Sequence, residues 1–309
     1  MARVRRTVFS LTRLQMSQLL AAAATMQPMD DSMTRLVLAG RWQLHRLLIG
    51  ALVFTGALAG QEATLRVTVY DERTAETVTG LGPERFSVKD GNTALQVVSA
   101  RELDTPVDTL LLVDASMVGN AVRPIVEAVI GRLDEGDSAA LVSFDESADL
   151  LQDFTADQGA LSKALDRIEY GNLPRLHDAL YAAIDGGFSA GSNRKAIIVL
   201  SAGVIARSRT SETEVVELAR AKGVSVYSVF VRNDARGALR RLALRTGGAS
   251  IAAKRTGLEP RQIATRILAA VDRQYALSVT GVYTLGDQIT AEIVSQTKTN
   301  LSASVLPID

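Results

Sequence analysis

Residues 110–116 read LLLVDAS, and this stretch decides how the centre of the chain folds. An unbroken apolar run predicts a strand buried on both faces of a sheet, as in parallel α/β proteins. The run ends at Asp114, and Ser116 follows two residues later. Apolar residues then recur at helical spacing from Val122 to Leu133. This strand, Asp-x-Ser and helix arrangement is how some α/β domains begin a metal site.

The same alternation of buried strands and amphipathic helices continues through residues 105–274. Residues 139–144, 196–200 and 224–231 predict further strands. Helical spacing lies between them, and Ser211-Glu212-Thr213-Glu214 is a capping box that opens one of these helices. The alternation predicts a mostly parallel sheet with helices on both faces.

The segments on either side of this core have a β pattern. Alternating apolar and polar residues, with a hairpin signal at Asp90-Gly91, predict strands within residues 60–104, and residues 275–309 return to the same pattern. A lone hairpin is marginally stable in water. We therefore expect the two flanks to pair into one small β-sandwich-like module, with the α/β domain inserted between them.

Residues 1–59 have the features of a leader that is absent from the mature protein. A short apolar run at residues 47–58 follows Arg41 and Arg46, and Ala57-Leu58-Ala59 supplies the small-x-small pattern of a signal-peptide cleavage site. The run is shorter than the roughly 20 residues of a membrane span. Met33 would give a signal of ordinary length, so the true start is either Met1 or Met33. The pattern favours export to the periplasm or secretion; the alternative is a disordered tail followed by an uncleaved anchor.

Composition narrows the possible chemistry. The 309 residues have no cysteine, which excludes disulfides and thiolate chemistry, and have only two histidines, His45 and His177. Lysine and arginine together number 34, as do the acidic residues. The leader holds seven of the basic residues and two of the acidic ones, so the remainder carries 27 basic against 32 acidic residues. Nothing in this balance indicates a nucleic-acid partner.

The core resembles a von Willebrand factor type A domain. The matching pieces, in order, are LLLVDAS (110–116), VSFDESADLLQDFT (142–155), LHDALYAAID (176–185), KAIIVLSAG (195–203) and VSVYSVFVR (224–232). The segment at residues 68–100 is similar to the leader of the bacterial VWFA-related family first described in acidobacteria. That resemblance implies a Rossmann-like core, a signal peptide and a protein-binding role.

The resemblance also implies a metal site that this chain has lost. The family binds Mg²⁺ through Asp-x-Ser-x-Ser in a first loop, a threonine in a second and an aspartate in a third. Asp114 and Ser116 remain, but the other three positions are Val118, Pro174 and Ala202. We therefore expect no Mg²⁺, Mn²⁺ or other cofactor, with Asp114 capping its own loop or the next helix.

A partner would then contact the same loops, through Asp114, Ser116, Arg175, His177 and Ser201. Without a cation, the charge of Asp114 needs compensation, because an unpaired buried charge is costly. Arg175 follows the lost threonine position, so its guanidinium is one candidate for this role. The alternative is that Arg175 points to solvent and water fills the gap.

No catalytic constellation is evident. Gly187-Phe188-Ser189-Ala190-Gly191 matches a nucleophile elbow, but a helix precedes it and a strand follows, the reverse of what the elbow needs. His177 lies at a helix start and is expected to be structural. A basic stretch, consisting of Arg232, Arg236, Arg240, Arg241, Arg245, Lys254 and Arg255, is either a solvated face or a surface for an acidic protein. The sequence favours a non-enzymatic protein-binding module of the adhesion or scaffold type; the alternative is a structural component of the cell envelope.

Export has a direct test. We expect N-terminal sequencing of the protein purified from its native host to begin at about Gly60, because cleavage follows the small-x-small motif. A mature protein that still carries residues 47–58 would contradict this expectation.

Overall fold

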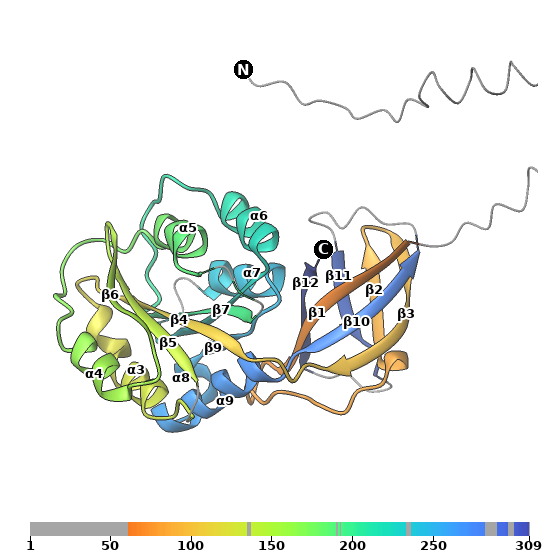
Figure 1. Ribbon diagram of the computed structural model, residues 1–309, viewed down its shortest axis with the longest axis horizontal. Coiled ribbons are helices and arrows are strands. Elements are labelled where there is room, and N and C mark those ends of the chain that lie inside the picture. Colours follow the sequence, from red (N-terminus) through yellow and green to blue (C-terminus); the bar gives the residue numbers. More distant parts are fainter. Residues whose placement is uncertain are drawn as a thin grey trace, which may run out of the picture. The chain divides into compact units, whose positions relative to one another are not determined.

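The computed structural model describes residues 61–134, 137–189, 191, 193–232, 236–281, 289–295 and 300–308 (Figure 1). Residues 60–309 form one compact unit, and residues 1–59 are not among the described residues. The leader, the signal peptide and the choice between Met1 and Met33 therefore lie outside the described residues. None of the helices in the described ranges has the length and hydrophobicity that a bilayer crossing requires.

The compact unit contains a six-stranded, mostly parallel sheet. Its strands, in spatial order, are β6 (Ala148–Thr155), β5 (Ser138–Phe144), β4 (Val107–Asp114), β7 (Arg194–Ser201), β8 (Val224–Phe230) and β9 (Ser250–Ala252). Only the edge strand β6 runs antiparallel to its neighbour within this sheet. Residues 110–114 thus lie in β4 in the middle of the sheet, and the prediction of a buried parallel strand there is confirmed.

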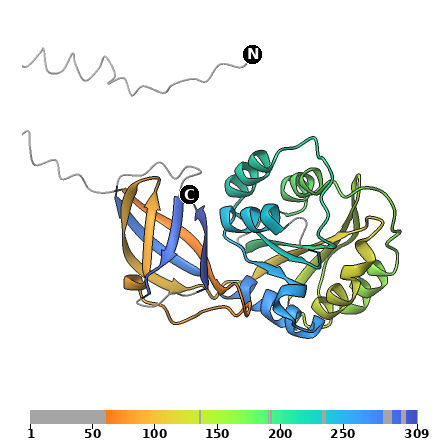
Figure 2. The same ribbon diagram turned by 180° about the vertical axis from the view of Figure 1, so that it is seen from behind.

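Helices cover both faces of this sheet, as the sequence predicts. They are α3 (Arg123–Ile130), α4 (Gln158–Leu165), α5 (Leu176–Gly186), α6 (Glu212–Lys222), α7 (Arg236–Arg245), α8 (Ala253–Thr256) and α9 (Pro260–Asp272), with a short 3-10 turn η2 (Gly119–Val122) before α3. Leu111 and Val113 of β4 pack with α3, α4 and α9, whereas Leu110 and Leu112 pack with α5, α6 and α7. Figure 1 and Figure 2 show these two groups of helices on opposite faces.

The flanks form a second, antiparallel sheet. Its order is β11 (Ile289–Ile293), β2 (Phe86–Asp90), β3 (Thr93–Glu102), β10 (Tyr275–Gly281), β1 (Gln61–Asp71) and β12 (Leu301–Ile308), with a 3-10 turn η1 (Pro83–Arg85) before β2. The prediction that both flanks share one module is confirmed, because β10 pairs with both β1 and β3. The expected sandwich is corrected: a single sheet curls until its edge strands β11 and β12 meet, close to a barrel around one apolar core.

A buried polar network joins the two sheets. The hydroxyl of Thr68 on β1 donates to the Gly247 carbonyl at 2.7 Å and accepts from Gln274 Nε2 at 3.1 Å. The Tyr227 hydroxyl lies 3.5 Å from Thr68 Oγ1, and burial raises the pKa of Tyr227 to about 12. These contacts link β1 to β8 and to the loop after α7.

Arg194 fixes the two points where the chain passes between the sheets. Its side chain is only 6% exposed. The guanidinium donates to the Thr105 carbonyl on the way into β4, and to the Val271 and Asp272 carbonyls on the way out to β10, at 2.8–3.0 Å. It also donates to Gln274 Oε1 at 3.1 Å, which ties Arg194 to the network around Thr68.

Two threonines provide a matched test of this network. Thr68→Val removes a buried hydroxyl that donates to the Gly247 carbonyl and accepts from Gln274 Nε2, so we expect a fall of about 1–3 kcal/mol in the free energy of unfolding in urea. Thr77→Val removes a buried hydroxyl that has no partner among the described residues. We expect it to change stability by less than about 0.5 kcal/mol or to raise it slightly. Equal losses in the two variants would show that the network does not stabilise the fold.

Candidate functional site

Asp114 ends β4 at the carboxyl edge of the parallel sheet, where such folds bind ligands. Its side chain is fully buried. Oδ1 accepts from the Ser116 backbone N–H at 2.9 Å, and Oδ2 accepts from the Ser201 hydroxyl and the Ala202 backbone N–H, each at 2.9 Å. The carboxylate therefore holds the loop after β4 against the loop after β7.

The loop after β4 turns tightly around this carboxylate. A Cβ at Gly119 would lie 2.2 Å from the Asp114 carbonyl oxygen, so the turn needs glycine there. Ser116 is 1% exposed, and its hydroxyl has no partner among the described residues. A bridge between Ser116 and Gly171, together with a bond from the Met117 N–H to the Asn172 carbonyl at 3.4 Å, brings in the loop before α5. Three loops thus converge at the end of β4.

Arg175 does not take the role that the sequence suggested. Its Nη2 atom lies 3.9 Å from Glu146 Oε1, and no hydrogen bond or ion pair joins it to Asp114 in the described part of the chain. Three uncharged donors already satisfy the buried carboxylate, so a guanidinium is not needed. Of the two alternatives, the one in which Arg175 offsets the charge of Asp114 is wrong, because two backbone N–H groups and the Ser201 hydroxyl bond the carboxylate instead.

His177 and Asp178 begin α5 and hold the loop that follows β7. The His177 backbone N–H donates to the Ser208 hydroxyl at 3.2 Å, and burial lowers the pKa of its imidazole. Burial alone would raise the pKa of Asp178. The bonds from the Thr210 and Arg209 N–H groups, at 2.7 and 3.1 Å, outweigh that effect and lower the pKa. Both residues therefore fasten loops, and the imidazole Nε2 has no partner among the described residues.

The side chains at the carboxyl edge can be compared with the needs of a divalent cation. Mg²⁺ requires near-octahedral oxygen ligation. Val118, Pro174 and Ala202 offer no side-chain oxygen, and the Asp114 carboxylate is already held by three donors. Within the described ranges, no group of three or more histidine and acidic residues is placed to hold a metal ion. This donor set does not fit the octahedral shell.

Apolar side chains surround the site instead. Met117 is 78% exposed, Leu173 is 56% exposed and Val118 is 41% exposed. A cleft of about 380 Å³ is lined by parts of the loops after β4 and β5 and of the segment before α5, mostly by polar residues. None of the three exposed apolar residues lines it, although Ala115 and Asn172 of its wall come from the same loops. Sequence reasoning missed Met117 and Leu173. The sequence did hold a signal for them: Met117 precedes Val118 and Leu173 precedes Pro174, and at both of these positions an apolar residue replaces a hydroxyl that would bind the metal.

The apparent nucleophile elbow lies in a connection between a helix and a strand. α5 ends at Gly186, Gly187 caps it, and β7 begins at Arg194. Ala190 lies outside the described residues. The strand-turn-helix context of a nucleophile is reversed around Ser189, so the prediction of an ordinary connecting loop is confirmed.

Similarity to a known domain family identifies the class of the α/β domain. Residues 108–259 match the family model of the von Willebrand factor type A domain. The chain therefore contains a von Willebrand factor type A domain, with the flanking β module built from residues outside that match.

Several solved structures are similar to this chain at low sequence identity. A von Willebrand factor type A protein from Catenulispora acidiphila is 13% identical over 82% of this chain and 75% of its own, with a TM-score of 0.45. BatB from Bacteroides thetaiotaomicron is 17% identical over 54% of this chain and 98% of its own, with a TM-score of 0.41. The PilB minor pilin from Streptococcus sanguinis, as its D319A mutant, is 14% identical over 53% and 60%, with a TM-score of 0.42. No curated protein sequence matches the chain.

Substitutions at Asp114 and Ser116 should change the stability of the protein by very different amounts. Asp114→Asn keeps one acceptor oxygen but places an amide against an N–H or hydroxyl donor, so we expect a loss of about 2–3 kcal/mol in the free energy of unfolding. Ser116→Ala removes an unpartnered hydroxyl and should cost less than about 0.5 kcal/mol. Chemical denaturation of both variants measures the difference. Equal, large losses would mean that the Ser116 hydroxyl also holds the loops together.

Proposed function

We propose that this protein is an exported, non-enzymatic module that binds a protein partner through the loops at the carboxyl edge of its parallel sheet, without a metal ion. The observation that carries the proposal is the burial and hydrogen bonding of the Asp114 carboxylate. Its carboxylate is buried and occupied by the Ser116 N–H, the Ser201 hydroxyl and the Ala202 N–H. It therefore acts as a clamp between two loops.

Loss of the metal changes what a partner can use. In metal-bearing relatives of this fold, a partner carboxylate completes the cation's shell. Here the exposed groups at the same place are the side chains of Met117, Val118 and Leu173. Exposed apolar side chains grouped at one edge of a fold are typical of protein-binding surfaces. We name Met117, Val118 and Leu173 the apolar rim and infer that it supplies the main contact area.

The absence of a catalytic role is supported by the chemistry of the site. A general base or nucleophile should be accessible and oriented by a second polar group. His177 is half-buried, and its neighbour Asp178 is occupied by two backbone N–H groups rather than by the imidazole. Export is supported by the apolar run at residues 47–58 and by the motif that ends at Ala59.

A capture experiment tests the apolar rim. The mature protein is immobilised on a resin and incubated with an extract of the native host's cell envelope. It should retain a discrete partner in fixed stoichiometry, and millimolar EDTA should not release that partner. The variant Met117→Ser/Leu173→Ser should lose the partner by at least about tenfold, because large exposed apolar side chains dominate such contacts. A matched control is Val98→Ser/Val294→Ser, which changes two exposed apolar residues of the β module.

Each other outcome has a defined meaning. Release by EDTA would show that a cation takes part in binding and would contradict the metal-free proposal. Equal capture by both double variants would place the contact elsewhere on the protein. The lack of any stoichiometric partner would favour the alternative function, a structural component of the cell envelope with no ligand of its own.

A further inference from the structure

A small cavity lies at the carboxyl ends of β8 and β9, and three arginines line it. These are Arg236 and Arg240 from α7 and Arg255 from α8. Phe230 and Ala252, the last residues of the two strands, form part of its wall, and Glu72 enters from the end of β1. Its volume is about 20 Å³. A cavity of this size has room for one small polar group.

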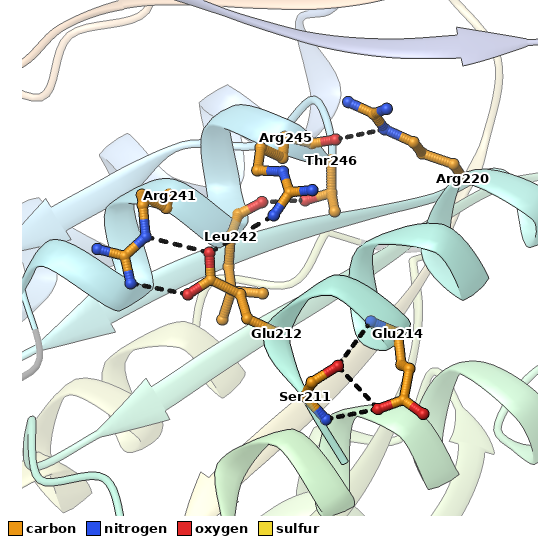
Figure 3. Close-up of polar contacts among 8 residues, drawn as sticks. All are labelled: Ser211, Glu212, Glu214, Arg220, Arg241, Leu242, Arg245 and Thr246. Carbon is orange, nitrogen blue, oxygen red and sulfur yellow. Dashed lines mark hydrogen bonds and ion pairs between the residues drawn. The ribbon is translucent and has the colours of Figure 1, made fainter. Parts of the chain in front are cut away.

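Two neighbouring arginines of the same basic stretch are already neutralised. Arg241 makes two bonds to Glu212, from Nε at 3.1 Å and from Nη2 at 2.8 Å, and Arg245 Nη1 lies 3.7 Å from the same carboxylate (Figure 3). Glu212 comes from the first turn of α6, next to the capping box of Ser211 and Glu214. These two arginines therefore fasten α7 to α6.

The arginines of the cavity have less compensation. The Arg240 Nε and Nη2 atoms both donate to Glu72 Oε1, the former at 2.9 Å. No hydrogen bond or ion pair joins Arg236 or Arg255 to any residue that the structure describes. The described lining thus has three guanidinium groups against one carboxylate, and that carboxylate is engaged by Arg240.

Like charges that line one cavity repel each other, so an anion that joins two of these guanidinium groups gains a favourable interaction with both. Guanidinium groups present paired N–H donors that match the two oxygens of a carboxylate. The two hydrogen bonds from Arg240 to the Glu72 carboxylate are an example of such binding within the cavity itself. A phosphate group is bulkier than the available volume, whereas one carboxylate oxygen fits it.

We propose that this arginine cavity, formed by Arg236, Arg240 and Arg255, binds an aspartate or glutamate side chain of an acidic segment in a protein partner. It lies on the same edge of the sheet as Asp114, because Phe230 ends the strand two places away. Adjacent strands are about 4.8 Å apart, so the two positions are separated by about 10 Å. An extended segment of about three residues spans that distance. One partner could therefore contact the apolar rim and the cavity together, although the cavity does not depend on the rim for its own binding.

The test uses a fluorescent hexaglutamate peptide and the mature chain, with binding followed by anisotropy at constant ionic strength. Hexaglutamate should bind and hexaglutamine should not. Arg236→Gln/Arg255→Gln should weaken binding by about tenfold or more, because charge-assisted bonds are lost. The matched control is Lys254→Gln/Arg261→Gln, which removes two exposed positive charges outside the cavity lining and should change affinity by less than about threefold.

Several results would overturn the proposal. Equal weakening by both double variants would show general electrostatic attraction, and unchanged binding by the cavity variant would place the contact elsewhere. Displacement by inorganic phosphate at far lower concentration than by free glutamate would identify a phosphate site. The cavity variant should melt at the same temperature as the wild type or higher, since repulsion is relieved; a fall of several degrees would show a structural role. Met117→Ser/Leu173→Ser should keep hexaglutamate affinity, which separates this proposal from that of the apolar rim.

Discussion

The buried guanidinium of Arg194 is the constraint on which the two-sheet arrangement depends. Burial lowers its pKa, because the charged form loses its hydration, yet arginine stays protonated under any ordinary condition. The charge must therefore be met by acceptors from the chain itself. Thr105, Val271 and Asp272 provide their carbonyls, and these residues lie where the chain enters and leaves the α/β domain. One charge thus fixes both crossings, and losing either set of acceptors would leave it uncompensated.

This arrangement explains why the chain can insert an α/β domain into a β module without a flexible joint. β10 follows α9 in the chain and pairs with β1 on one side and with β3 on the other. The network of Thr68, Gln274 and Gly247 then lies directly beside the crossing. Since the Thr68 hydroxyl, the Gln274 amide and the Arg194 guanidinium all donate to buried acceptors, these contacts hold the junction. The carboxyl edge of the parallel sheet is consequently presented on a rigid base, which suits a surface that binds a partner.

Charge along that edge is handled in three ways. Asp114 is stabilised by hydrogen bonds from uncharged groups, Arg241 and Arg245 share the Glu212 carboxylate, and Arg236 and Arg255 form no ion pair with a described residue. The first two arrangements stabilise loops and helices. The third leaves two guanidinium groups whose paired N–H donors match the oxygens of a carboxylate. The edge therefore combines an apolar rim near β4 with a basic cavity near β8 and β9.

The sequence by itself determined the order of elements, the buried central strand at residues 110–113 and the capping box at Ser211, because apolar periodicity and capping residues are local signals. The pairing of the two β flanks could also be predicted, because neither flank has enough strands to be stable alone. The sequence also located the edge residues Asp114, Ser116 and Ser201, because their types occur at the ends of predicted strands. Tertiary structure alone decided that the flanks curl into one near-barrel, that Arg175 pairs with Glu146, and that the basic stretch divides into paired and unpaired arginines. Those outcomes depend on distances between residues far apart in the chain. A pattern along the sequence fixes which face a side chain occupies, but only folding decides which distant group it meets.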